Sequence, residues 1–431
     1  MLKNKKGITL VALVVTIVVL LILAGVSINL VLGNNGIIAK AKDAETKSAE
    51  ASQNDLIGMN ELAQQLEEQI NGSTGNGGKT EPETVPYLPS DDFHYDTSTS
   101  VDTGLVIKDA SGNEYVWVVV PRTTAVYKTT GLGKTTFTDA DYTSIENDLK
   151  EYTKTYRNGT GYSDTYAADD KNVGWFADAT AYNNLKNSML KSVYENGGFY
   201  VGRYEAGIDT TTGTNRTSKG PTNSDGKYTI EGMPAPVTKA DAYPYTYVTR
   251  TQAQNLASNV NSGTKTSSLM FGVQWDLVLA FMSKDTAKIT STDVLTKDST
   301  TIGNYYNSTF QLSQTGKYAM YSNWKLSPTW NPSTTATTSF VDSSRNKLVQ
   351  PGTDGILVTT GTSEKNKVMN IYDIAGNVWE WTLEKTSYVS YPCAERGGFF
   401  NNDGSDSPAV DRGYNDTTYA YSSVGFRLSL W

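Results

Sequence analysis

Cysteine and histidine are almost absent from this chain of 431 residues, which contains one of each. A single cysteine excludes an intrachain disulfide framework. A single histidine, His94, leaves little material for a Ser-His-Asp triad or a His-rich metal site. The acidic and polar residues around His94 indicate a solvated loop. The fold must therefore depend on its hydrophobic core.

Basic residues are also in short supply. The chain has 37 Lys and Arg against 45 Asp and Glu, a net charge of −8, and no basic stripe beyond its extreme N-terminus. We therefore expect no nucleic-acid partner. A length of 431 residues is enough for two or three domains, and a hydrophobic content of 38% is enough for a core. Tyrosine is abundant, with 27 residues, and its mixture with Ser, Thr, Asn and Gly is typical of recognition surfaces.

Long apolar runs are limited to one segment near the N-terminus. Lys3, Lys5, Lys6 and Gly7 precede a run of apolar and small residues over 8–32, which is long enough to span a bilayer. The lysines favour a cytoplasmic start, so the rest of the chain is expected to be extracytoplasmic. We predict a single-pass protein of the cell membrane or cell surface.

The order of residues in KNKKGITLVALVVTIVVLL resembles the N-terminus of type IV prepilins and pseudopilins. The resemblance implies a leader over 1–7, cleavage after Gly7 by a prepilin peptidase, methylation of Ile8 and possible packing in a fibre with other pilin-like subunits. The family usually has Phe where Ile8 stands and Glu where Ala12 stands. The missing carboxylate favours a membrane-bound or minor subunit, and a plain transmembrane anchor is the alternative.

Two segments separate the apolar run from the rest of the chain. Residues 33–70 predict a helical stalk, with Leu56, Met59, Ala63, Leu66 and Ile70 at three-four spacing. This stripe could pack on its own domain, on a neighbouring helix or in a coiled coil. Residues 71–86 are rich in glycine and then proline, which predicts a flexible linker.

Residues 87–431 predict a domain of the α+β class. LVIKDASGNEYVWVVV, over 105–120, has the pattern of a hairpin with a turn near Gly112, and GGFYVGRYEAG contains a further strand. Two amphipathic helices are expected over 249–260 and 268–282, and NVWEWTL and VGFRLSLW are expected to be late strands. Residues 121–197 give no clear pattern beyond a long, polar insertion.

The ordered motifs FYVGRYEAG, FGVQWDLVLAF, NIYDIAGNVWEWT, RGGFF and GFRL resemble the formylglycine-generating enzyme (sulfatase-modifying factor) family over most of 198–431. The resemblance implies a C-type-lectin-like fold. In DIAGNVWEW, the tryptophans are expected to be structural, while Gly376 and Asn377 suit a turn.

The same motif implies a structural calcium ion. Carried over by position, its ligands would be the side chains of Asp373 and Glu380 and the carbonyl oxygens of Gly376 and Val378, and oxygen ligands suit Ca²⁺. The alternative is an unliganded turn with two ordinary acids.

The enzymatic activity of the family is not expected here. The two cysteines of the family correspond to Asn402 and Ser407, so the thiolates that bind copper and attack the substrate are missing, and no copper is expected. Cys393 precedes the RGG strand and is expected to be a small buried side chain. We therefore predict a protein that is not an enzyme, with no catalytic residues.

In place of the active site stands NNDGSDSPAVDRGYNDTTYAYSS, residues 401–423, which is composed like a paratope. The arrangement resembles variable proteins of diversity-generating retroelements, in which asparagine codons are randomised at adenines. Such mutation cannot yield Lys, Glu, Gln, Met or Trp, and none of these occurs in 401–423. The predicted ligand-binding residues are Asn401, Asn402, Asp403, Ser405, Asp406, Asp411, Tyr414, Asn415, Asp416, Tyr419 and Tyr421.

These features predict a surface-displayed, adhesin-like or receptor-like protein whose C-type-lectin-like domain binds an extracellular protein or glycan. Two rival functions stay open. One is a minor subunit of a pilus or pseudopilus, in which the outer domain is a spacer and tolerates any substitution over 401–421. The other is a formylglycine-generating type of oxidase, which would require copper-dependent turnover.

Overall fold

The computed structural model describes residues 86–168, 175–215, 230, 232–260 and 265–431. The chain divides into two compact units, Met1–Thr80 and Glu81–Trp431, and the boundary falls within the predicted linker 71–86. The predicted leader with Gly7 and Ile8, the apolar helix 8–32 and the stalk 33–70 lie outside the described residues. Among the residues that are described, no helix is both long and apolar enough to cross a membrane.

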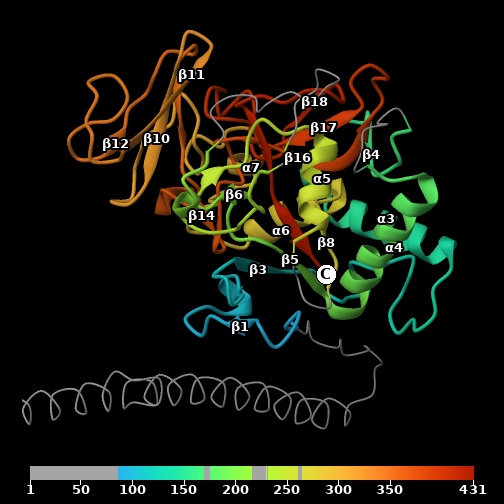
Figure 1. Ribbon diagram of the computed structural model, residues 1–431. Coiled ribbons are helices and arrows are strands. Elements are labelled where there is room, and N and C mark those ends of the chain that lie inside the picture. Colours follow the sequence, from blue (N-terminus) through green and yellow to red (C-terminus); the bar gives the residue numbers. More distant parts are fainter. Residues whose placement is uncertain (1–85, 169–174, 216–229, 231, 261–264) are drawn as a thin grey trace, which may run out of the picture. The chain divides into compact units, whose positions relative to one another are not determined.

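A six-stranded sheet forms one layer of the second unit (Figure 1). Trp117 pairs with Tyr200, and Leu430 pairs with the same residue from the other side, so the end of the chain is built into the sheet. The hairpin predicted over 105–120 is confirmed, since its two strands pair in antiparallel. The strands, in spatial order, are β1 (His94–Tyr95), β2 (Val106–Lys108), β3 (Glu114–Val119), β5 (Gly198–Gly202), β20 (Leu428–Leu430) and β8 (Ser267–Leu269).

A five-stranded sheet forms the second layer and contains the late motifs of the sequence. β16 pairs in antiparallel with β17 and in parallel with β19, and β4 pairs with the end of β16. The chain passes directly from this sheet to the first one between β19 and β20, at Arg427. The strands are β18 (Arg412–Asn415), β17 (Cys393–Arg396), β16 (Trp379–Thr386), β19 (Val424–Phe426) and β4 (Tyr162–Ser163).

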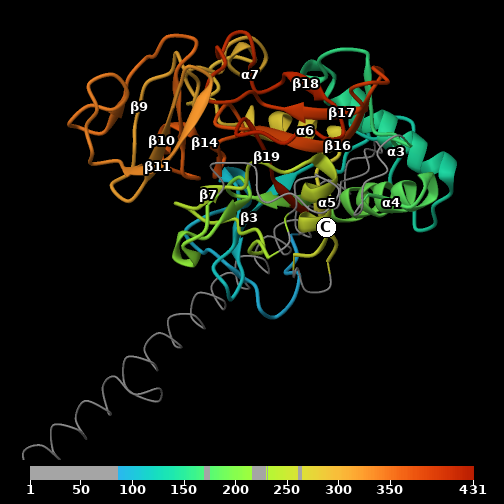
Figure 2. The same cartoon turned by 45° about the horizontal axis from the view of Figure 1, so that its top comes forward.

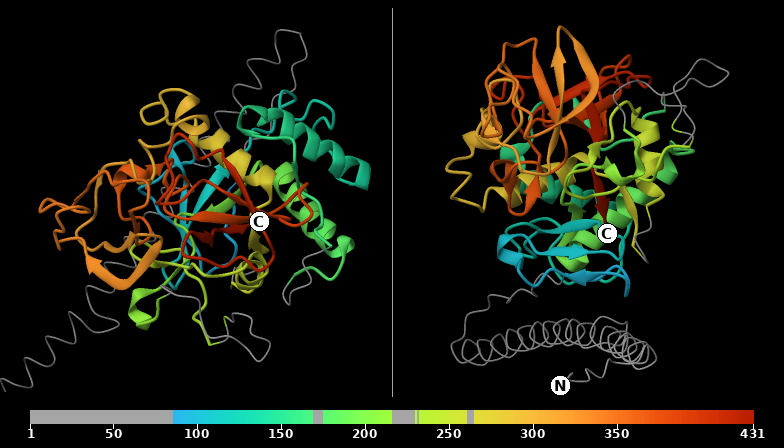
Figure 3. Two further views of the ribbon diagram at one scale, coloured as in Figure 1. Left: turned by 90° about the horizontal axis from the view of Figure 1, so that it is seen from above. Right: turned by 60° about the vertical axis from the view of Figure 1, so that its left-hand side comes forward.

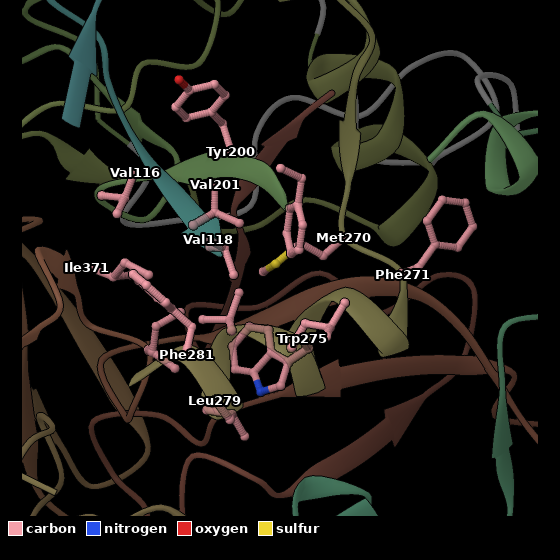
Figure 4. Close-up of a cluster of buried hydrophobic side chains, with 14 of the residues drawn as sticks. Val116, Val118, Tyr200, Val201, Met270, Phe271, Trp275, Leu279, Phe281 and Ile371 are labelled. Atoms are coloured by element: carbon pink, nitrogen blue, oxygen red, sulfur yellow. The ribbon is translucent and has the colours of Figure 1, made fainter. Parts of the chain in front are cut away.

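Helix α6 (Gly272–Met282) packs between the two sheets, with contacts to both β3 and β16. All eleven of its residues are buried, which explains why its sequence is apolar on every side. Figure 4 shows Trp275, Leu279 and Phe281 of this helix among Val116, Val118 and Val201 of the first sheet. The helix predicted over 268–282 is thus confirmed in its C-terminal part, while Ser267–Leu269 forms strand β8.

The other helices include two that the sequence did not reveal. α3 (Asp139–Tyr152) and α4 (Ala179–Asn196) occupy the stretch that was interpreted only as a polar insertion. Thr138 and Asp178 cap their N-termini, and α4 buries Tyr182, Met189 and Val193 on one face. The helix expected over 249–260 is present as α5 (Arg250–Ser258), and α7 (Asp293–Thr296) is one turn long.

A three-stranded sheet, β11-β10-β13, lies on the side of the core opposite α3 and α4 (Figures 2 and 3). Its strands are β10 (Lys317–Ser322), β11 (Lys325–Pro332) and β13 (Gly355–Val358). The remaining pairs are β6 (Gly207–Ile208) with β7 (Tyr243–Pro244), β9 (Phe310–Gln311) with β12 (Asn346–Lys347), and β14 (Lys367–Val368) with β15 (Ile371–Tyr372). The unit is thus a mixed α and β structure in which short strands predominate, as the α+β prediction requires.

Candidate functional site

The predicted variable segment crosses one face of the five-stranded sheet. β18 and β19 are on opposite sides of β17 and β16 in the sheet. The part of the segment that follows β18 must therefore cross these two strands to reach β19. On the way, the ring of Tyr419 meets that of Trp381 on β16 edge to face, with centroids 6.2 Å apart. The segment therefore has the rigid sheet beneath it, which limits the entropy that its side chains lose on binding.

A pocket of about 540 Å³ opens where this segment meets the hairpin of β10 and β11. Its volume is within the ordinary range for small-molecule sites. The lining is mainly aromatic. It also contains the ammonium group of Lys325, the aliphatic side chain of Leu326 and the hydroxyl groups of Ser422 and Ser423. The six aromatic residues are Tyr247, Tyr321, Trp324, Phe399, Tyr419 and Tyr421.

Tyr419 and Tyr421 form the side of the pocket that belongs to the predicted segment. Their ring centroids are 4.6 Å apart, and the hydroxyl groups of Tyr419 and Ser423 are in hydrogen-bond contact at 3.2 Å. Burial raises the pKa of Tyr419 to about 12, so its hydroxyl is a neutral donor or acceptor at neutral pH. The amide of Tyr247 donates to the carbonyl of Tyr421 at 3.0 Å, which joins the segment to the chain before α5.

The hairpin of β10 and β11 provides the opposite side. Its two turn residues, Asn323 and Trp324, have φ angles of 51° and 65°, as a type I′ turn requires. Asparagine tolerates this conformation, but a tryptophan there is a backbone outlier. The side chain of Trp324 is 70% exposed. Tight packing therefore does not account for the choice of tryptophan at this turn.

Predicted residues 401–406 form a turn that does not line the pocket. Asp403 accepts from the amide of Ser405 at 2.8 Å and from the hydroxyl of Tyr306 at 3.0 Å. Asn402 accepts from the amide of Phe399 at 3.0 Å, Asn401 is buried, and Asp406 is exposed. The side chains of Asn402 and Asp403 thus stabilise the turn, and a role of 401–406 in ligand binding stays a prediction.

The remaining predicted residues, Asp411, Tyr414, Asn415 and Asp416, lie in β18 or directly beside it. Tyr414 is 44% exposed and has the rings of Tyr388 and Tyr391 beside it, 4.7 and 5.9 Å away between centroids. Asp411 precedes β18 and is half-buried, and Asp416 accepts from the amide of Thr418 at 2.7 Å. These residues do not line the pocket either, so the predicted binding list divides among several places.

A buried carboxyl group lies under the crossing segment. Glu395 on β17 is opposite Trp381 and is 5% exposed, and its Oε1 accepts from the side-chain amide of Asn415 at 2.9 Å. Its Oε2 is buried without a hydrogen-bond partner. Burial, together with a smaller contribution from the nearby Asp411, raises the pKa of Glu395 to about 8. The group is therefore mainly protonated at pH 7.

Comparisons with known proteins give remote likenesses. No family model matches the chain, and no curated protein matches it. Similar solved structures include a variable protein 1 from Treponema denticola, CarF, and PvdO from Pseudomonas aeruginosa, each at 14% identity. They cover 54%, 54% and 63% of this chain and 84%, 85% and 91% of their own, with TM-scores of 0.28, 0.29 and 0.25. These remote likenesses assign no function to the chain, and its site is described by its own geometry.

Two of the predicted calcium ligands, Glu380 and Asp373, contact one arginine, Arg427. Glu380 accepts from Nη2 and Nε of Arg427, at 2.6 and 3.1 Å, and the same guanidinium donates to the carbonyls of Tyr372 and Asp373. The carboxylate of Asp373 accepts from the amide of Gly361 at 2.8 Å. The described residues contain no group of three or more acidic, His or Cys side chains placed for a metal. The carboxylate of Glu380 is thus paired with Arg427, and the calcium site stays a prediction.

The DIAGN turn has the structural role that was expected of it. Gly376 has a φ of 70°, and a Cβ there would lie 2.2 Å from the carbonyl oxygen of Asn304. Asn377 donates to Glu205 at 2.6 Å and accepts from the amide of Val358 at 3.1 Å. Trp379 and Trp381 are buried, which confirms that they belong to the core.

The positions that correspond to the family's cysteines are part of the same turn as Asp403. Asn402 accepts from the amide of Phe399 through its side chain, and Ser407 is buried with its amide bonded to the carbonyl of Asp403. Cys393 is buried in β17, as expected, and His94 is exposed in β1. These contacts give both positions a structural role.

Sequence reasoning missed the pocket residues outside 401–423. Tyr247, Tyr321 and Phe399 have no motif of their own, since aromatic residues are common in cores. One signal was present at Ser322–Lys325, where SNWK separates two runs of strand-forming residues. A tryptophan in a two-residue turn has no core to fill, so its position predicts an exposed contact residue.

Proposed function

We propose that this chain is a surface-displayed, non-catalytic protein that binds a ligand in the aromatic pocket of a C-type-lectin-like domain. The pocket is the observation that carries the proposal, because it joins two tyrosines of the diversifiable segment to a fixed aromatic hairpin. Aromatic side chains provide large contact areas at low entropic cost. The exposed residues of 401–416 lie outside the lining of this pocket.

Display at the cell surface is the second part of the proposal. It depends on the basic start of the chain, the prepilin-like glycine Gly7 and the apolar run over 8–32. An anchored domain would present its pocket to an extracellular protein or glycan. Absence of catalysis is proposed because Asn402 and Ser407 stand where a copper-binding pair of cysteines would be required.

Two tyrosines provide a matched test of the pocket. Tyr421 lines it and Tyr414 does not, yet they are 45% and 44% exposed and belong to the same segment. Purified protein with Tyr421→Ala, Tyr414→Ala or no change is applied to arrays of bacterial surface proteins and glycans. Loss of a central aromatic contact costs about 1–2 kcal/mol, so Tyr421→Ala is expected to weaken binding about tenfold while Tyr414→Ala leaves it unchanged.

The outcome distinguishes a ligand-binding protein from a pilus subunit whose outer domain is only a spacer. Equal weakening by both substitutions would place the ligand on the outer surface of the segment instead of in the pocket. Unchanged binding in both variants would remove the predicted segment from recognition and favour the pilus-subunit function.

A further inference from the structure

The pocket lining has a distinct charge pattern. It contains no aspartate or glutamate, and Lys325 is its one residue with a formal charge. Its other polar side-chain atoms are hydroxyl groups and the indole N–H of Trp324, all of which can donate hydrogen bonds. A lining that donates hydrogen bonds, carries one positive charge and has no carboxylate complements an anionic ligand.

Lys325 is available for such a ligand. No carboxylate of the described residues forms an ion pair with it. Asp354, which precedes β13, accepts from the hydroxyl of Ser322 at 2.7 Å and from the amide of Asn323 at 3.2 Å. That carboxylate is thus engaged in fixing the base of the turn, and the ammonium group beside the pocket has no built-in counter-ion.

Trp324 supplies the second element of recognition. Trp324 has a positive φ, which strains the backbone of a tryptophan, and it is 70% exposed. Such backbone outliers concentrate at functional sites. An exposed indole at the edge of an aromatic pocket presents a face on which a planar group can stack, at about 0.5–1.5 kcal/mol beyond area burial. Trp324 and Lys325 are adjacent in sequence, so a ring and a cation are offered together.

Building on the proposed function, we infer that the pocket takes an aromatic ring that carries a carboxylate, with Trp324 and the tyrosines holding the ring and Lys325 holding the carboxylate. Such a group can come from a free aromatic acid or from an aromatic residue beside an acidic residue in a polypeptide. The chemistry of recognition is the same for both sources.

The test uses the full chain in detergent, with isothermal calorimetry at 0.15 M NaCl. At this ionic strength the Debye length is about 8 Å, so the net charge of −8 is screened at a distance while a contact with Lys325 is retained. The free probes are indole-3-acetate, its neutral amide indole-3-acetamide and cationic tryptamine. The peptide probes are N-acetyl-Trp-Asp-amide and N-acetyl-Trp-Asn-amide.

Each acid is expected to bind about two to five times more tightly than its amide, which is the size of one exposed ion pair. Tryptamine is expected to bind most weakly of the indoles. Lys325→Met should equalise acid and amide without changing amide affinity, while Trp324→Ala should weaken every probe. If indole-3-acetate binds more tightly than N-acetyl-Trp-Asp-amide, the ligand is a free aromatic acid. If the peptide binds more tightly, the ligand is part of a polypeptide.

Three results would overturn the inference. They are equal affinity for acid and amide in the unchanged protein, a preference that persists in Lys325→Met, and no binding of any probe. In the first two cases the amides still bind in the pocket, which leaves the proposed function standing and rejects only the ligand class. In the third, the array experiment with Tyr421→Ala and Tyr414→Ala decides the proposed function independently.

Discussion

Strand β17 separates two buried environments that differ in how completely their charges are paired. Adjacent residues of a strand face opposite sides of the sheet, so Arg396 points toward α6 and Glu395 points toward the crossing segment. Nη2 of Arg396 donates to Asp276 at 2.9 Å, and its Nη1 donates to Glu384 at 3.2 Å. Glu395, by contrast, has one hydrogen bond to an amide and one buried oxygen without a partner.

The α6 face is a closed ionic cluster. Asp276 also accepts from Arg412 and Arg157, at 2.9 and 2.8 Å, and Arg412 reaches Glu384 as well. Every charge has at least one opposite charge in contact, with three guanidinium groups sharing two carboxylates. Such a cluster fixes how α6, β16, β17 and β18 pack, and it belongs to the scaffold.

On the opposite face of β17, one carboxyl oxygen of Glu395 has no hydrogen-bond partner. This face lies under the segment that we propose to be variable. A segment that tolerates replacement of its side chains cannot supply a fixed counter-ion to the strand below it. A neutral, protonated glutamic acid is compatible with this requirement, because it has no charge to be compensated. β17 thus has a residue with fixed ion pairs, Arg396, on one side. On the other side its residue Glu395 contacts a segment whose side chains can be replaced.

The largest effect is expected from breaking the α6 cluster. Asp276→Asn leaves Glu384 as the one carboxylate among three guanidinium groups, and should lower the free energy of unfolding by about 3–5 kcal/mol in urea titrations. Arg396→Met leaves two charges of each sign and should cost less. Asp293→Asn is the matched control, since Asp293 is exposed in its pair with Lys297, and its effect should stay within about 0.5 kcal/mol. Similar losses for Asp276→Asn and Asp293→Asn would show that the cluster is not a scaffold.

The other face predicts a dependence on pH. The pKa of Glu395 is about 8 in the folded chain and 4.5 in the unfolded chain. Between pH 4.5 and pH 8 the folded chain therefore holds one more proton than the unfolded chain. Its contribution therefore makes the protein less stable as pH rises from 4.5 to 8, by about 1.4 kcal/mol per pH unit. Glu395→Gln should remove this slope in urea titrations from pH 5 to pH 8. An unchanged slope would mean that Glu395 is ionised when folded.

Much of the fold could be predicted because its patterns are local. The hairpin around Gly112, the helix around Trp275 and the strand from Trp379 are each visible in periodicity and turn residues. Helices α3 and α4 were missed because Thr, Tyr and Asn dilute their apolar faces and have weaker helix propensity than Leu or Ala. Their caps, Thr138 and Asp178, were the available signal.

The site could be predicted only in part, because it is made by long-range packing. Composition predicted 401–423 to be a recognition segment, and two of its tyrosines line the pocket. No local pattern could show that residues from 247, 321–326 and 399 meet them there. The calcium set illustrates the same limit, since Asp373 and Glu380 are close in sequence but the cation between them is Arg427, 47 residues after Glu380.

The smallest effect is expected at the hairpin turn, where stability and binding should change in opposite directions. Glycine accepts a positive φ without strain, so Trp324→Gly should stabilise the protein by about 1 kcal/mol in urea titrations while weakening indole-3-acetate binding at least fivefold. Asn323→Gly is the matched control, because Asn323 has the same conformation but does not line the pocket. It should add a few tenths of a kcal/mol of stability and leave affinity unchanged. Loss of affinity in both variants would mean that turn geometry, and not the indole ring, is what the ligand requires.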